Sequence, residues 1–184
     1  MKVLIQRVKK ASVTINNELY SSVDKGILSF IGVEKGDTQE QVQKYAKKIV
    51  NLRIFPDENG KMNRSLVDEN GEMLIVSQFT LCGDCKKGTC PSFDNSAPPE
   101  IAKNLYENFV QEVSSYGIKT KTGQFGAMMD VALINDGPVT FMILLILEYG
   151  FFIFEKLEVF HILAYSVHES RFYLFKYCIP ISGL

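Results

Sequence analysis

Four strand-like runs follow one another at the start of the chain with no helix between them. They are KVLIQRV (2–8), ASVTIN (11–16), ELYSSV (18–23) and GILSFIGV (26–33), each with hydrophobic residues at the spacing of a strand. A doubly wound sheet alternates strands with helices. The order of these runs argues against that architecture and favours antiparallel pairing of neighbouring strands.

Two later segments have the periodicity of amphipathic helices. In residues 38–52, Thr38 and Gln41 have the spacing of a capping box. Residues 98–117 have prolines at their start and Gly117 at their end. The expected buried stripes are Val42, Tyr45, Ala46, Ile49 and Val50 in the first helix, and Ile101, Leu105, Phe109 and Val113 in the second.

The remaining predicted strands are 53–55, 72–81, 118–123, 128–135 and 138–146. Together these elements predict an α+β domain with a largely antiparallel, barrel-like sheet and two amphipathic helices. The segment INDGPVT (134–140) is ambiguous. Asp-Gly indicates a turn, yet Pro138 leads straight back into a strand-like run, so Gly137-Pro138 is either a connection or part of a functional surface.

The chain divides by composition into a domain, residues 1–146, and a tail, residues 147–184. The tail holds both histidines and an excess of aromatic side chains. It is either an extension that packs on the barrel or the product of readthrough or a frameshift. Charged residues interrupt its apolar stretches, so no membrane span is expected.

The net charge, the N-terminus and the cysteines restrict the classes of function and the cellular location. A net charge of −1 argues against a basic protein that binds nucleic acid nonspecifically. The N-terminus has no secretory signal pattern. Cys82, Cys85 and Cys90 are clustered and Cys178 is remote, which makes a poor disulfide framework and indicates a reducing, cytoplasmic location.

Residues 1–146 contain no histidine, so a Ser-His-Asp triad or a Cys-His pair cannot be built there. The same lack argues against zinc at the three clustered cysteines, which are interpreted as free thiols. We expect no metal and no cofactor. Any hydrolysis by this domain must rely on groups other than an imidazole base.

Two stretches carry candidate binding residues. Ser77, Gln78, Phe79 and Thr80 are either the exposed end of a strand or a pocket wall whose backbone N–H groups face an oxyanion. Phe125 and Met129, beside a glycine, are either core residues or the lining of an adenine-sized pocket.

The motifs QRV, SQFTL, PSF, SAPP, GxFGAxM and NDGPVTF occur in one order within residues 1–146. In this order they resemble the D-aminoacyl-tRNA deacylase family, formerly D-tyrosyl-tRNA deacylase. The resemblance implies a homodimer, with active sites near the interface, that cleaves the ester of D-aminoacyl-tRNA in chiral proofreading. Mischarged glycyl-tRNA is a further expected substrate.

The resemblance also implies roles for single residues. Ser77, Gln78, Phe79 and Thr80 would form the catalytic segment, and Gly137-Pro138, with a cis peptide, would enter the partner's pocket and exclude L-amino acids. Phe125 and Met129 would lie on the adenosine side, and Arg7 would hold the Gly-Pro loop. The 2′-hydroxyl of the terminal ribose would assist cleavage.

The sequence departs from the family pattern at Cys90, where the family usually has arginine, at Met128, where it commonly has aspartate, and in the tail. The first departure weakens any assignment of phosphate contacts to the loop around Cys90. The alternative function is a noncatalytic RNA- or nucleotide-binding module of the same fold.

Overall fold

The computed structural model of the chain describes residues 1–86 and 88–145; the predicted tail, with its two histidines, lies outside the described residues. The elements, in chain order, are β1 (Lys2–Ile15), β2 (Glu18–Val23), β3 (Gly26–Gly32), α1 (Gln39–Val50), β4 (Phe55–Pro56), β5 (Met62–Arg64), β6 (Glu72–Ser77), the 3-10 helix η1 (Phe79–Cys82), α2 (Pro99–Ser115), β7 (Lys119–Thr122) and β8 (Asp130–Ile143).

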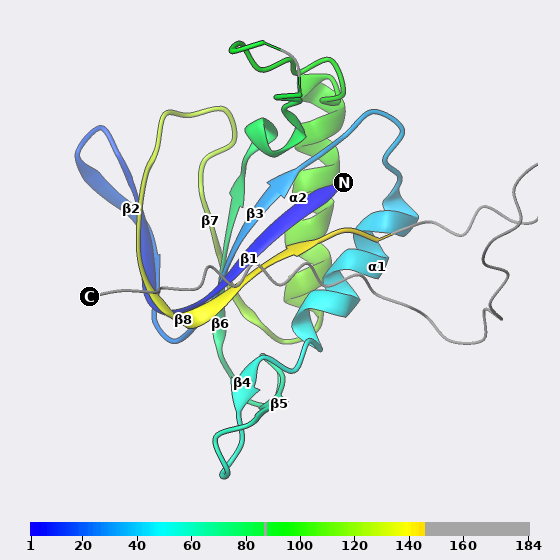
Figure 1. Cartoon of the computed structure of the whole chain (residues 1–184). Coiled ribbons are helices and arrows are strands. Elements are labelled where there is room, and N and C mark those ends of the chain that lie inside the picture. Colours follow the sequence, from blue (N-terminus) through cyan, green and yellow to red (C-terminus); the bar gives the residue numbers. More distant parts are fainter. Residues whose placement is uncertain (87, 146–184) are drawn as a thin grey trace, which may run out of the picture.

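Six strands form one strongly curved sheet in the order β2-β1-β3-β6-β7, and β8 pairs with β1 (Figure 1). β1 is antiparallel to β2, β3 and β8, whereas β3, β6 and β7 run parallel to one another. Between the edge strands β2 and β7, the Ser21 hydroxyl donates to the Thr122 carbonyl over 2.7 Å. The sheet is therefore a nearly closed barrel, which confirms the predicted α+β fold with a barrel-like sheet.

Two predicted strand pairs are each one continuous strand. The predicted strands 2–8 and 11–16 both lie in β1, which ends at Ile15, and the predicted strands 128–135 and 138–146 both contribute to β8. β1 contains a register shift against β8 between Val8 and Lys10. An extra residue reverses the alternation of faces. The sequence pattern is interrupted at this point although the strand continues.

The predicted strand 72–81 is too long. β6 ends at Ser77, and the chain then turns into η1. This turn passes close over Gly32, where a Cβ would lie 2.9 Å from Leu81 Cβ and 3.1 Å from the Gln78 carbonyl oxygen. Only glycine leaves room for this approach. The polar end of the predicted strand is therefore a turn that follows the C-terminal end of β6.

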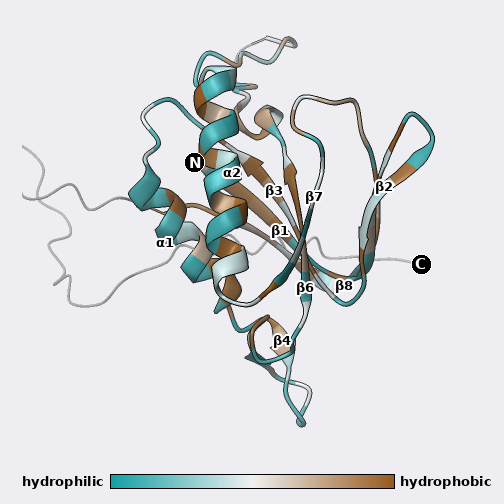
Figure 2. Ribbon diagram, turned by 180° about the vertical axis from the view of Figure 1, so that it is seen from behind, coloured by the Kyte–Doolittle hydropathy of each residue, from teal (hydrophilic) through white to brown (hydrophobic). Residues whose placement is uncertain are grey.

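The two helices cover one face of the sheet and pack against each other (Figure 2). The capping box of Thr38 and Gln41 is present, and all five predicted residues of the α1 stripe are buried. The prediction for α2 is wrong at Ile101, which is 52% exposed; Tyr106 is buried instead. The chain enters α2 from an exposed loop, so its first turn lies beyond the core.

Hydrophobic side chains fill both faces of the sheet. Ile27, Ile31 and Ile75 belong to the cluster under the helices, whereas Leu28 and Leu74 belong to a cluster inside the barrel. Neighbouring residues on one strand thus face opposite layers, which explains why the central strands are apolar at nearly every position.

Candidate functional site

The segment SQFT lies where β6 ends. Ser77 still pairs with Ile31 of β3, and Gln78 donates its backbone N–H to the Ile31 carbonyl over 2.8 Å. The Gln78 side-chain amide donates to the Thr80 hydroxyl. Phe79 and Thr80 are exposed. The segment is thus a strand end at which the Gln78 and Thr80 side chains are joined to each other at the surface.

The backbone of Phe79 and Thr80 opens η1. The first N–H groups of a helical turn have no partner within that turn. Neither of these two N–H groups donates a hydrogen bond to the described residues. Two adjacent free donors beside the Thr80 hydroxyl can bind an oxyanion or a carbonyl oxygen.

Phe125 and Met129 lie in the loop that follows β7. Because β6 and β7 are parallel, this loop comes to the same end of the sheet as Ser77–Thr80 (Figure 1). The Gly123 N–H donates to the Ile75 carbonyl over 2.9 Å. The parallel pairing thus brings two of the predicted site segments together.

Both side chains are half-buried. The Phe125 ring lies 5.8 Å from the Tyr106 ring, centroid to centroid. The Met129 sulfur would lie 2.6 Å from a Cβ on Gly123, so that glycine gives it room. Each packs on a core cluster and keeps part of its surface open. The core and the pocket-lining interpretations are therefore compatible.

Gly137-Pro138 lies within β8 and is not a hairpin turn. Opposite the single residue Arg7 of β1, β8 has residues 136–139, so these form a bulge between the pairs Gln6–Thr140 and Val8–Asn135. The Gly137-Pro138 peptide is cis, and both residues are exposed. The interruption by Asp-Gly-Pro thus displaces the strand locally without ending it.

Arg7 holds this bulge from beneath. Its guanidinium is buried and its Nε donates to the Asp136 carbonyl over 3.0 Å and to Asp136 Oδ2 over 2.9 Å. Another of its nitrogens, Nη1, donates to the Ile54 carbonyl. Arg7 therefore fixes the residue immediately before Gly137.

Asn135 secures the other side of the bulge. Its side-chain amide donates to the carbonyls of Arg7 and Val139, each over 3.2 Å. Asn135 and Asp136 were not among the predicted site residues. Their position next to Gly137-Pro138 was the available signal, but only the fold shows that their side chains and carbonyls brace the bulge.

One chain does not bring the bulge to the SQFT segment. Arg7 pairs with Ile27 at the start of β3, whereas Ser77 pairs with Ile31 near its end. Four residues of strand separate these levels by about 13 Å. Within the described chain, Gly137-Pro138 and Thr80 therefore belong to different ends of the sheet.

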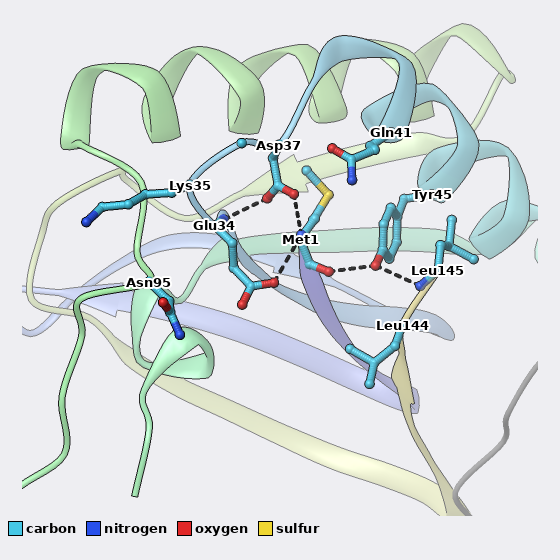
Figure 3. A pocket seen from close by; sticks show the side chains of 10 residues that line it. Met1, Glu34, Lys35, Asp37, Gln41, Tyr45, Asn95, Leu144 and Leu145 are labelled. Carbon is cyan, nitrogen blue, oxygen red and sulfur yellow. Dashed lines mark hydrogen bonds and ion pairs between the residues drawn. The ribbon is translucent and has the colours of Figure 1, made fainter. Parts of the chain in front are cut away.

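A separate hollow of about 610 Å³ lies beside α1, between Met1, Asp37, Tyr45 and Leu145 (Figure 3). The Met1 amino group pairs with Asp37 and with Glu34 Oε2, the latter over 3.2 Å. The Tyr45 hydroxyl donates to the Met1 carbonyl over 2.6 Å and accepts from the Leu145 N–H over 3.0 Å. These groups bind one another, so the hollow is a structural junction of the two ends of the domain.

Tyr45 gives stability a testable pH dependence. Burial raises the pKa of Tyr45 above its ordinary value of 10.0, and burial also raises the pKa of Tyr106, whose hydroxyl donates to the Ile75 carbonyl over 2.8 Å. Above pH 10 the unfolded chain loses these protons at a lower pH than the folded chain does. The unfolding free energy should therefore fall as pH rises, by at most about 1.4 kcal/mol per pH unit for each tyrosine.

Urea unfolding between pH 9 and pH 11 measures this slope. Tyr106→Phe should lower stability at neutral pH, because the Ile75 carbonyl loses one of its two donors and keeps only the Gly123 N–H. It should also reduce the alkaline slope. A wild-type unfolding free energy that stays constant across this range would contradict the prediction.

The cysteines Cys82, Cys85 and Cys90 are free thiols, and burial raises the pKa of Cys82. Among residues 1–86 and 88–145, no three His, Cys, Asp or Glu side chains are grouped so that they could hold a metal ion. No helix in the same residues is both long and apolar enough to cross a membrane.

A family model described as D-Tyr-tRNA(Tyr) deacylase matches residues 4–144. The chain belongs to this family. The match includes Arg7, the SQFT segment, Phe125, Met129 and Gly137-Pro138. A deacylase is a hydrolase, so the predicted family and enzyme class are confirmed.

Relatives of this deacylase family support the same conclusion. The D-aminoacyl-tRNA deacylase of Thermosipho africanus is 55% identical over 143 residues, which cover 78% of this chain and 96% of that protein. The D-aminoacyl-tRNA deacylase of Desulfatibacillum aliphaticivorans is 57% identical over 143 residues, covering 78% of this chain and 98% of that protein.

Two solved structures share the fold. A solved structure of the c-Myc DNA unwinding element binding protein is 39% identical, with a TM-score of 0.75, and the match covers 80% of this chain and 100% of that chain. A probable eukaryotic D-amino acid tRNA deacylase has a TM-score of 0.68 at 18% identity and covers 77% of this chain and 97% of its own. The latter likeness concerns the fold alone.

Proposed function

We propose that this protein hydrolyses the ester bond of D-aminoacyl-tRNA and so removes D-amino acids, and glycine attached to a noncognate tRNA, before translation. The observation that carries the proposal is the pair of N–H groups of Phe79 and Thr80 at the end of β6, which have no acceptor among residues 1–86 and 88–145. They lie at the same end of the sheet as Phe125 and Met129, in a chain whose family is named for this reaction.

The reaction is a hydrolysis of a carboxylic ester. Water adds to the ester carbonyl, the bond from the carbonyl carbon to the ribose oxygen breaks, and that oxygen leaves with a proton. In this proposal the Phe79 and Thr80 N–H groups at the start of η1 stabilise the negative charge on the carbonyl oxygen. Residues 1–146 contain no histidine, so the 2′-hydroxyl of the terminal ribose is the group proposed to assist the proton transfer.

The bulge at Gly137-Pro138 is proposed to select chirality. It is exposed, and Arg7 and Asn135 hold its backbone from both sides. A rigid wall of backbone next to the α-carbon excludes an L side chain and admits a D side chain or the hydrogen of glycine. This selection needs no contact with the side chain itself, so broad specificity for D-amino acids follows.

The filter requires a second copy of the chain. The bulge and the SQFT segment lie at different levels of the same sheet, about 13 Å apart along β3. In a homodimer, the bulge of one subunit can enter the partner's site. Dimerisation is therefore part of the proposal, and sedimentation of the active enzyme measures it.

The direct test compares D-Tyr-tRNA with L-Tyr-tRNA. Wild-type protein should release D-tyrosine faster than the rate in buffer and leave the L-ester intact. Binding of tRNA without hydrolysis would favour the alternative, a noncatalytic RNA-binding module. Glycyl-tRNA carrying a noncognate anticodon tests the wider substrate range.

Thr80→Val distinguishes positioning from nucleophilic attack. The Thr80 hydroxyl accepts a hydrogen bond from Gln78, and residues 1–146 contain no histidine that could activate it, so we assign it a positioning role. Its loss should lower kcat/KM for D-Tyr-tRNA by about tenfold, the effect of about one hydrogen bond. Thr80→Ser should retain activity. Complete loss in Thr80→Val with full activity in Thr80→Ser would identify Thr80 as the nucleophile instead.

A further inference from the structure

Phe79 and Phe93 form an exposed aromatic pair beside the candidate catalytic segment. Phe79 is 58% exposed and Phe93 is 37% exposed. Their ring centroids lie 5.1 Å apart with the ring planes tilted by 58°. Exposed aromatic rings give nucleobases a face on which to stack. The pair is therefore suited to a ligand that lies against π faces.

The pair is held by the surrounding backbone. Asp84 and Ser92 exchange two backbone hydrogen bonds of 2.8 and 3.0 Å, which fix the segment that carries Phe93. A Cβ on Gly83 would lie 3.0 Å from the Phe93 ring, so the absence of a side chain there lets the ring rest on the backbone. Phe93 is thus supported on one side by Gly83 and contacts Phe79 on another.

We infer that Phe79 and Phe93 form a stacking platform for the unpaired nucleotide that precedes the terminal adenosine of the substrate tRNA. This inference rests on the proposed function, which places the terminal ester at Phe79 and Thr80. The 3′ end of tRNA is single-stranded, so its bases are free to stack on aromatic rings. After the terminal adenine, which the proposed function places beside Phe125 and Met129, the preceding base is the unpaired base closest to that ester.

Stacking also suits the charge of the protein. With a net charge of −1, the chain has little general attraction for phosphate, and base stacking does not depend on such attraction. Phe93 would act as a positioning residue that orients the RNA while taking no part in the bond-breaking step.

The kinetic test compares two substrates, D-Tyr-tRNA and 3′-D-tyrosyl-adenosine, which lacks the preceding nucleotides. Phe93→Ala and Phe93→Leu should each raise KM for D-Tyr-tRNA about 5- to 150-fold, the range for loss of one stacked base. The two variants should leave kcat/KM for tyrosyl-adenosine unchanged, and Phe93→Tyr should restore the KM for tRNA. Equal losses on both substrates, or no loss on either, would overturn the platform.

A binding readout keeps the inference separate from the proposed function. The chain contains no tryptophan, so Phe93→Trp creates a single fluorescent reporter. Uncharged tRNA ending in CCA should quench this reporter, whereas tRNA without its last three nucleotides should not. Tyr20→Trp on β2, at another exposed site, is the matched control and should respond to neither RNA.

Each fluorescence outcome decides whether the tRNA end or a second copy of the chain covers the aromatic pair. Quenching that needs the CCA end supports the platform even if no ester is cleaved, a result that would reject only the proposed function. Fluorescence that depends on protein concentration and is insensitive to RNA would show that a second copy of the chain covers the pair, and the platform would be wrong.

Discussion

Gly137→Ala should reduce the preference for D-Tyr-tRNA over L-Tyr-tRNA by tenfold or more. A Cβ on Gly137 would lie 2.0 Å from Asn135 Oδ1 and 3.3 Å from the Val139 nitrogen. Asn135 must then move, and its hydrogen bonds to the Arg7 and Val139 carbonyls are lost. A displaced bulge no longer excludes the L side chain, and a tenfold change corresponds to about 1.4 kcal/mol. The ratio of kcat/KM for the two esters measures the effect.

Asn135→Ala is the matched control for this substitution. It removes the same two hydrogen bonds without adding an atom to the bulge, so it should lower discrimination in the same direction and by less. A Gly137→Ala enzyme that cleaves the D-ester normally and still leaves the L-ester intact would mean that the bulge does not select chirality.

Arg7→Ala should destabilise the domain by about 2–4 kcal/mol, somewhat less than the usual loss for breaking a fully buried ion pair. The guanidinium is buried and donates to the carbonyls of Asp136 and Ile54 as well as to the Asp136 carboxylate. Its removal leaves these carbonyls without their donor, whereas the Asp136 carboxylate is partly exposed and regains water. Denaturant unfolding gives the change in free energy, and deacylation of D-Tyr-tRNA should fall with it.

A double-mutant cycle with Asp136→Ala isolates the ion pair from the other contacts of Arg7. Asp136→Ala alone should cost less than Arg7→Ala, since it leaves the contacts to both carbonyls intact. Arg7→Lys should recover only part of the loss, because an ammonium group cannot reproduce the fork of the guanidinium. Wild-type stability and discrimination in Arg7→Ala would show that Arg7 does not hold the bulge.

Local patterns predicted most of the individual elements. The helix α1 begins at the capping box of Thr38 and Gln41, and its apolar spacing identified the buried face. Such features depend on contacts within one or two turns, which the sequence contains in full. The family resemblance, carried by motifs such as SQFTL and NDGPVTF, was confirmed over residues 4–144.

Predictions failed where a distant segment decides the backbone path. The strand predicted over 72–81 ends at Ser77 because the chain turns across Gly32 of another strand. Residues 128–135 and 138–146 contribute to one strand because β1 continues past the bulge and pairs with both halves. Strand continuity is a property of the partner strand, which no local window includes.

The order of apolar and polar residues alone determined that the chain forms an α+β domain with two amphipathic helices. Its composition alone determined that residues 1–146 hold no imidazole for catalysis. Tertiary structure alone decided which residues meet. Parallel pairing of β6 and β7 placed Phe125 and Met129 at the same end of the sheet as Ser77–Thr80, and pairing of β1 with β8 set Arg7 beneath the Gly137-Pro138 bulge. The physical reason is that hydrophobic spacing specifies which face of a strand is buried, whereas hydrogen bonding between distant strands specifies its neighbours and register.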